Sequence, residues 1–110
     1  MLEDKVIIVE GTSDRKRVKL VLDEPVNVVC TYGTLSDEKL EELIFPIEDS
    51  DVYILVDADD AGEKLRKQLK RELPNATHLY TQKVYRQVET TPLDYLAQVL
   101  RGHFNVKEIR

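Results

Sequence analysis

Cysteine, methionine, tryptophan and glycine are scarce in this 110-residue sequence, which has one Cys, one Met, no Trp and four Gly. The single cysteine, Cys30, cannot form an internal disulfide, and since it lies in an apolar stretch we expect a small core residue. Such cysteine usage is typical of a reducing compartment, so we expect a cytoplasmic location. No apolar run is long enough to cross a bilayer and no signal peptide is visible, so we expect no membrane association.

Positive charge is also in deficit. The 16 Lys and Arg residues against 21 Asp and Glu residues leave a net charge of -5, which does not favour attraction of the whole surface to nucleic acid or to an anionic membrane. The chain is 42% hydrophobic and 34% charged, as expected of a soluble globular protein. Its length fits one domain spanning residues 1–110, and we see no repeat, linker or low-complexity segment.

Apolar stretches alternate with helical patterns along the chain. Strands are predicted at residues 5–9, 26–30, 52–56 and 77–81, and helices at 13–22, 37–44, 61–73 and from Thr91 to Gly102, while 82–87 stay unassigned. This alternation predicts an α/β fold, a mainly parallel sheet of about four strands that is doubly wound, with helices on both faces. The first and third strands are apolar throughout, which predicts adjacent positions inside the sheet.

Polar residues and prolines set the expected helix limits. The predicted N-caps are Thr12 or Ser13, Ser36, Asp60 in a capping box with Glu63, and Thr91 in a capping box with Asp94. Pro46 is expected to end the second helix, and Pro92 to be the first residue of the last one.

Acidic residues follow the two strands that we expect at the centre of the sheet. Glu10 follows the first strand, and Asp57 and Asp59 follow the third. Ligands bind at the carboxyl ends of strands in open α/β sheets, and residues two apart in an extended segment point to the same side. Like charges so close raise one another's pKa unless a cation lies between them. A hard divalent cation with oxygen ligands would remove that cost.

These two motifs resemble the Toprim domain. They are an apolar strand followed by Glu10-Gly11, and an apolar strand followed by Asp57-x-Asp59-x-x-Gly62. The domain is shared by type IA and type II topoisomerases, bacterial primases, recombination mediators, ribosomal-RNA maturation nucleases and OLD-type nucleases. The turn at residues 31–34, which contains Gly33, is similar to a glycine-containing turn of the family, and the resemblance covers roughly residues 4–82.

The resemblance implies a Toprim-type, Rossmann-like fold and a set of residue roles. Glu10 would be the general acid/base, while Asp57 and Asp59 would hold Mg²⁺ or Mn²⁺. Such a pair of roles suits phosphodiester chemistry, in which a metal neutralises developing oxygen charge and a nearby group moves a proton.

Further residues near the motifs are additional candidates for the site. They are Gly11, Asp14, Gly33, Thr34, Asp60, Gly62 and Glu89. Gly11 and Gly62 either allow a close backbone approach or serve as turn glycines, and helix capping explains Asp60 better than a metal does. Glu89 lies in a stretch similar to a Val-Glu-containing stretch of the maturation nucleases. It is either a further acid near the metal or a surface residue before the last helix.

Basic residues gather in the two predicted helices that begin at the acidic edge. They are Arg15, Lys16, Arg17 and Lys19 in one helix and Lys64, Arg66, Lys67, Lys70 and Arg71 in the other. Arg15, Lys16 and Lys64 are the candidate phosphate contacts. The alternative is an ordinary solvated helix face, supported by a pairing of Glu63 with Lys67.

We therefore expect Mg-dependent phosphodiester chemistry on nucleic acid, RNA or DNA, by a small nuclease. Topoisomerase and primase activities are not expected, because the chain offers no further DNA-gripping or zinc-binding unit. The alternative is a non-catalytic module that binds metal, nucleotide or a protein partner in nucleic-acid metabolism. Glu10 favours catalysis, since metal binding alone does not need an acid/base, and the small size favours the module.

Overall fold

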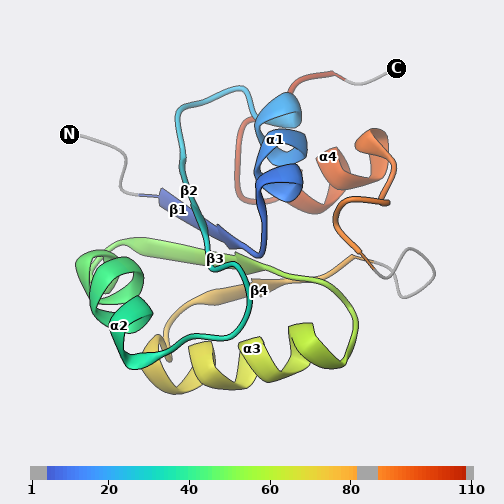
Figure 1. Ribbon diagram of the computed structural model, residues 1–110. Helices are drawn as coiled ribbons and strands as arrows, with labels where there is room; N and C mark the ends of the chain where they lie inside the picture. Colours follow the sequence, from blue (N-terminus) through green and yellow to red (C-terminus); the bar gives the residue numbers. More distant parts are fainter. Residues whose placement is uncertain (1–4, 82–86, 109–110) are drawn as a thin grey trace.

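The computed structural model describes residues 5–81 and 87–108, and in it strands and helices alternate along the chain (Figure 1). The strands are β1 (Lys5–Val9), β2 (Asn27–Cys30), β3 (Asp51–Leu55) and β4 (Thr77–Leu79). They form one sheet in the order β2-β1-β3-β4, and every neighbouring pair is parallel. The predicted adjacency of the first and third strands is confirmed. β4 is shorter than predicted, and all but the last of the unassigned residues 82–87 lie outside the described residues.

Helices cover both faces of the sheet, which confirms the doubly wound α/β architecture. They are α1 (Thr12–Val21), α2 (Asp37–Lys39), α3 (Asp60–Glu72) and α4 (Leu93–Arg101). In Figure 1, α1 and α4 lie on one face, and α2 and α3 lie on the other. None of the helices in the described ranges has the length and apolar character needed to cross a membrane.

The second helix differs from its prediction. Only Asp37–Lys39 is α-helical; a π-helical turn, Leu40–Ile44, and a 3-10 turn, Phe45–Ile47, continue it. Pro46 therefore does not end the helical segment, contrary to the prediction. It stands in the first turn of the 3-10 segment, where a missing backbone N–H is tolerated because it would have no acceptor within the helix.

The core consists of two apolar layers, one on each face of the sheet. Ile7 and Val9 of β1 pack in the layer beneath α1 and α4, whereas Val6 and Ile8 pack in the layer beneath α3. These four side chains are at most 1% exposed, and burying a side chain of this kind contributes about 1.5 to 3 kcal/mol. Cys30 is buried in the first layer, as predicted.

The apolar stripe predicted for the third helix faces the sheet along most of its length. Leu65, Leu69 and Leu73 are buried in the second layer, but Ala61 at the start of the stripe is exposed. The stripe thus fixes α3 against β1 and β3, while Asp60 and Ala61 at the start of the helix are exposed at the carboxyl edge of the sheet.

The helix starts confirm one predicted cap and correct the other three. Ser36 caps α2 as predicted, since its hydroxyl accepts the Lys39 N–H at 3.2 Å. α1 begins after Gly11, so neither Thr12 nor Ser13 is its cap. α4 begins after Pro92, which is the cap rather than the first helical residue. Thr91, the predicted cap, donates its hydroxyl to the Gln87 carbonyl at 2.8 Å instead of capping α4.

α3 begins one residue earlier than its predicted capping box requires. The chain bends at residues 58 and 59 after β3, and Asp59, with φ -138° and ψ 179°, becomes the N-cap. Its carboxylate accepts the Gly62 N–H at 2.8 Å. Asp60 is therefore an exposed first helical residue, and the predicted box with Glu63 is wrong.

Candidate metal centre

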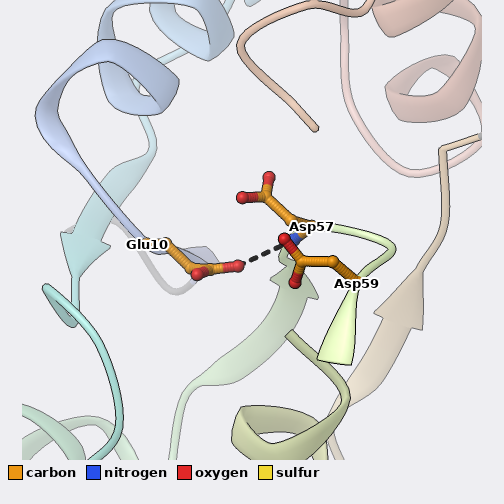
Figure 2. A group of neighbouring side chains, drawn as sticks. All are labelled: Glu10, Asp57 and Asp59. Atoms are coloured by element: carbon orange, nitrogen blue, oxygen red, sulfur yellow. Dashed lines mark hydrogen bonds between the residues drawn. The ribbon is translucent and has the colours of Figure 1, made fainter. Parts of the chain in front are cut away.

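The acids that follow β1 and β3 come together at the carboxyl edge of the sheet (Figure 2). One carboxylate oxygen each from Glu10, Asp57 and Asp59 lies within 4.8 Å of the other two. All three residues are half-buried, and they meet because adjacent parallel strands end at the same edge. Several carboxylate oxygens around one point are the donor set that Mg²⁺ and Mn²⁺ take. The residues present therefore fit a hard divalent cation.

Each of the three carboxylates is oriented by one backbone N–H. Glu10 Oε1 accepts from the Asp57 N–H at 2.8 Å, the contact drawn in Figure 2. Asp57 Oδ1 accepts from the Val88 N–H at 2.9 Å, and Asp59 Oδ1 from the Gly62 N–H at 2.8 Å. Because an ionised carboxylate has about four lone-pair sites, each acid retains capacity for a cation or a proton.

Burial and mutual repulsion disfavour ionisation of Glu10 and Asp57. Burial raises the pKa of Glu10, the Asp57 N–H opposes that rise, and the charges of Asp57 and Asp59 add to it. Burial likewise raises the pKa of Asp57, with the Val88 N–H opposing. A bound cation would favour the ionised forms and reverse both shifts. The electrostatics thus agree with the donor set in favouring a cation here.

Asp14 is a fourth acid beside this centre, and it is almost buried. It is 7% exposed and accepts the Gly11 N–H at 3.1 Å. Burial, followed by the charge of Asp57, raises the pKa of Asp14 to about 6. Its carboxylate therefore helps to hold the turn that carries Glu10 and adds negative charge behind it.

Glu89, the other predicted additional acid, is exposed. Its charge contributes to the raised pKa of both Asp14 and Asp57, so it lies within electrostatic reach of the centre. The preceding residue, Val88, is the one that orients Asp57. A role for Glu89 in metal binding stays a prediction.

The predicted glycines differ in what the backbone demands of them. A Cβ on Gly62 would lie 1.9 Å from the carbonyl oxygen of Asp57, so only glycine fits there. A Cβ on Gly11 would lie 3.8 Å from the nearest atom, the Asp14 carboxylate, which is ordinary contact. Gly33 has φ +108°, the left-handed region that favours glycine. Thr34 follows it as an exposed residue of the same turn.

The candidate phosphate contacts lie in the first two turns of the helices that leave the acidic edge. Arg15 of α1 is half-buried, and Lys16 and Lys64 are exposed. All three follow Glu10 or Asp59 within a few residues, but their contact with phosphate stays a prediction.

Arg66 was grouped by sequence with these surface cations, and the structure corrects that assignment. It is 2% exposed, and its guanidinium donates to the carbonyls of Leu79 at 2.7 Å and Val56 at 3.3 Å. Glu63 lies 3.7 Å from Arg66 Nε, so this acid is paired with Arg66 instead of with Lys67. The one signal in the sequence was its place beside the apolar stripe of this helix, directly after Leu65.

Arg66 supports the end of the strand that carries Asp57. Burial lowers the pKa of Arg66, while the charges of Tyr80, Glu63 and Glu10 oppose that shift. Because the guanidinium joins the carbonyl before Asp57 to the end of β4, it holds these two strand ends together. The buried cation also lies near enough to Glu10 for their charges to interact.

Known proteins similar to this chain match most of it, but the match covers different shares of their own lengths. It is 51% identical over 107 residues to a Bacillus subtilis (strain 168) protein named YusF, described as uncharacterized, which covers 96% of this chain and 73% of that protein. It is 36% identical over 80 residues to Ribonuclease M5 of Fusobacterium nucleatum, covering 73% of this chain and 44% of that enzyme. It is 31% identical over 80 residues to Ribonuclease M5 of Bacillus subtilis (strain 168), covering 72% of this chain and 42% of that enzyme. The chain thus spans less than half the length of these ribonucleases.

A solved structure agrees with the fold. It is that of a small TOPRIM domain protein from Bacillus stearothermophilus, with a TM-score of 0.89 and 55% sequence identity, covering 97% of this chain and 92% of that one. The sequence pattern of the Toprim domain itself matches residues 5–89, a range that includes all four strands and both acidic motifs. By sequence pattern and by fold together, the chain belongs to the Toprim domain family.

Proposed function

We propose that this protein is a small cytoplasmic nuclease that cleaves nucleic-acid phosphodiester bonds with the help of Mg²⁺ or Mn²⁺. The observation that carries the proposal is the convergence of Glu10, Asp57 and Asp59 within 4.8 Å at the carboxyl edge of the sheet. Membership in the Toprim family and the relatives named Ribonuclease M5 support it. Those names also make RNA the first substrate to test.

Asp57 and Asp59 are the residues that would hold the metal. Their orientations are set by the Val88 and Gly62 N–H groups, so the two side chains need little reordering when a cation binds. The bound metal would neutralise charge that develops on the phosphate oxygens. Preset ligand orientations of this kind reduce the entropy that binding costs.

Glu10 would move the proton. Its carboxylate is held by the Asp57 N–H through Oε1 and has lone pairs left for the proton of an attacking or leaving oxygen. Burial raises the pKa of Glu10, which brings it nearer to neutral pH. A general acid/base works best when its pKa is close to the operating pH, so the shift suits this role.

A cleavage assay tests the proposal. Wild-type protein is incubated with labelled RNA and DNA oligonucleotides in Mg²⁺, in Mn²⁺ and in EDTA. We expect cleavage in at least one metal and none in EDTA. Asp57→Asn should abolish cleavage, while Asp51→Asn should retain it, because Asp51 is an exposed acid at the opposite end of the same strand. Failure to cut any substrate in either metal would refute the nuclease.

One observation favours a second function, a module that binds metal or a partner without cleaving. The net charge is -5, and Arg66 and Lys39 donate to backbone carbonyls within the protein instead of lying free for phosphate. The same assay separates the two functions. A module would bind Mn²⁺ through Asp57 and Asp59 and leave every oligonucleotide intact.

A further inference from the structure

Two exposed tyrosines flank the acids along the carboxyl edge of the sheet. Tyr32 follows β2 and Tyr80 follows β4, the two outer strands, while the acids follow the two central strands. Tyr32 is 61% exposed and Tyr80 is 55% exposed. We propose that these rings stack on unpaired bases and hold a single-stranded nucleic acid across the candidate metal centre. This inference rests on the proposed function and names the substrate class that the site would take.

Tyr32 is held in place by contacts that reach the acidic centre directly. Its N–H donates to the Glu10 carbonyl at 2.7 Å. The Lys39 ammonium donates to the Tyr32 carbonyl at 3.1 Å, and the Tyr32 hydroxyl lies 3.0 Å from Thr12 Oγ1. Its φ is +54°, a left-handed conformation that bulky residues seldom adopt. Such conformations persist where surrounding contacts hold them, and they cluster at functional sites.

Tyr80 is held from the other side by the buried arginine. Its ring lies over the Arg66 guanidinium at 4.1 Å from the centroid. The His78 ring stacks beside it with a centroid distance of 6.4 Å and an interplanar angle of 27°. Arg66 also binds the carbonyl that precedes Asp57. The tyrosine is therefore anchored to the metal-binding loop, and more than half of it still faces solvent.

The distribution of charge favours stacking as the source of affinity. Arg17 donates to the Thr91 carbonyl, Lys5 to the His103 carbonyl and Lys39 to the carbonyl of Thr31, so part of the basic charge is used inside the protein. Stacking of a base on an aromatic ring contributes independently of phosphate contacts and tolerates any sequence. Two rings beside the centre can thus bind a strand that the net charge of -5 does not attract.

The arrangement favours a single strand over a duplex. The outer strands β2 and β4 are three strand spacings apart, about 14 Å in all, and the acids lie between them. A strand that rests on both tyrosines would therefore pass over Glu10, Asp57 and Asp59. In a duplex the bases are stacked on one another, so their faces are not open to a protein ring unless they are unpaired.

Binding measurements with matched aromatic controls test the inference. Glu10→Gln serves as the background that slows cleavage, and fluorescence anisotropy follows a short labelled single-stranded RNA. Tyr32→Ala and Tyr80→Ala should each weaken binding about 5- to 150-fold, the range expected for one stacked base. Tyr32→Phe and Tyr80→Phe keep a ring and should bind within a few fold of the background. Phe45→Ala is the matched control, because Phe45 is 46% exposed and lies in the 3-10 turn that leads toward the start of β3.

Two further ligands make the test specific for bases. An abasic strand of the same length keeps its phosphates and should bind weakly, with no dependence on either tyrosine. The duplex of the same sequence should compete poorly with the single strand. If the alanine variants bind the single strand as tightly as the background does, or if the duplex binds as well as the single strand, the inference is wrong. Thermal melting of each variant shows whether a loss of binding reflects misfolding. If an alanine variant is unstable, the other alanine variant and the comparison of the abasic strand with the ordinary single strand decide the case.

The stacking surface and the nuclease can fail separately. Cleavage that depends on Asp57 but is unchanged in Tyr32→Ala and Tyr80→Ala would leave the nuclease standing and overturn the stacking surface. Tyrosine-dependent binding of a single strand that no metal causes to be cut would support the stacking surface and refute the nuclease.

Discussion

The two edges of the sheet are both acidic, yet they differ in how the acids are held. At the carboxyl edge, Glu10, Asp57 and Asp59 are half-buried and converge within 4.8 Å. At the amino edge, a cavity of about 550 Å³ lies beside the starts of β3 and β4. Four acids line it, Glu48, Asp49, Asp51 and Glu72, and all but the last are exposed. This cavity thus lies at the edge where most of the acids face water.

Backbone N–H groups hold the acids at the carboxyl edge of the sheet close together. The turn that leaves β3 places the Asp57 and Gly62 N–H groups where they bind Glu10 and Asp59, and the segment before α4 adds the Val88 N–H for Asp57. These contacts hold partly buried like charges together, at a free-energy cost that a cation would offset. The candidate cation site therefore follows from strand order and from the turn at residues 57–62, and the cavity at the amino edge lies away from it.

The largest effect should come from replacing Glu10, the proposed general acid/base. Glu10→Gln is expected to lower single-turnover cleavage about 10²- to 10⁴-fold, the usual contribution of general acid-base catalysis. Gln can still accept the Asp57 N–H, so the melting temperature should change little. Glu72→Gln at the amino edge is the control and should cleave like wild type. A Glu10→Gln variant with wild-type rates would remove the role assigned to Glu10.

A backbone contact gives the next effect. Gly62→Ala should destabilise the protein by about 3 kcal/mol, the upper part of the range for overpacking, because its Cβ would meet the Asp57 carbonyl oxygen at 1.9 Å. Gly102→Ala is the matched control, since a Cβ there meets nothing within 4 Å. Urea unfolding of the two variants measures the difference. Equal stabilities would show that the turn at residues 57–62 adapts easily.

The gain in stability on adding metal can be measured for variants at each edge of the sheet. Mn²⁺ at 100 times its dissociation constant should stabilise the wild type by about 2.7 kcal/mol, seen as a higher melting temperature than in EDTA. Asp59→Asn should lose this gain, although Asn caps a helix as well as Asp does, so α3 should remain intact. Asp49→Asn should keep the gain. A metal response that survives in Asp59→Asn and disappears in Asp49→Asn would move the site to the amino edge.

The smallest effect is the pH dependence of stability without metal. The pKa of Asp14 is about 6 in the folded protein against 3.8 ordinarily, so the folded state binds the proton more tightly. Lowering the pH from 7 to 5 in EDTA should therefore raise stability, by about 1 kcal/mol for this group. The gain is fully present below pH 3.8 and is lost as the pH rises through 6.

Asp14→Asn should reduce the pH-dependent gain, whereas Asp49→Asn should not. The raised pKa values of Glu10 and Asp57 act in the same direction, so some gain should remain in Asp14→Asn. Denaturant unfolding at the two pH values measures it. A wild type that is less stable at pH 5 than at pH 7 would contradict the raised pKa of Asp14.

Sequence predicted the strands and the convergence of Glu10, Asp57 and Asp59 better than it predicted the helix starts. An apolar run such as Val6–Val9 has only one stable place, inside the sheet, and two such runs that end in acid bring those acids to one edge. The start of α3 depends on where the chain bends after β3, and a pattern of residue types does not encode that position. Asp59 thus proved to be the helix cap as well as a candidate ligand.

Tertiary contacts set the remaining limits of sequence-based prediction. Arg66 carries a charge, which suggested a surface residue. The carbonyls of Val56 and Leu79 that bind it are distant along the chain, so the sequence around Arg66 does not reveal its burial. The burial of Asp14 likewise depends on the packing of α1 beside the acids, because the sequence around it is polar. Both residues affect the centre through neighbours that are distant along the chain.

The hydrogen bond from the Asp57 N–H to Glu10 Oε1 also provides a spectroscopic reporter. The amide proton of Asp57 senses the charge on the Glu10 carboxylate, so its NMR chemical shift should follow the ionisation of Glu10 during a pH titration. Its hydrogen-exchange rate should report whether the ends of β1 and β3 stay together. A single resonance can therefore follow, in solution and without substrate, whether the two halves of the acidic centre are assembled.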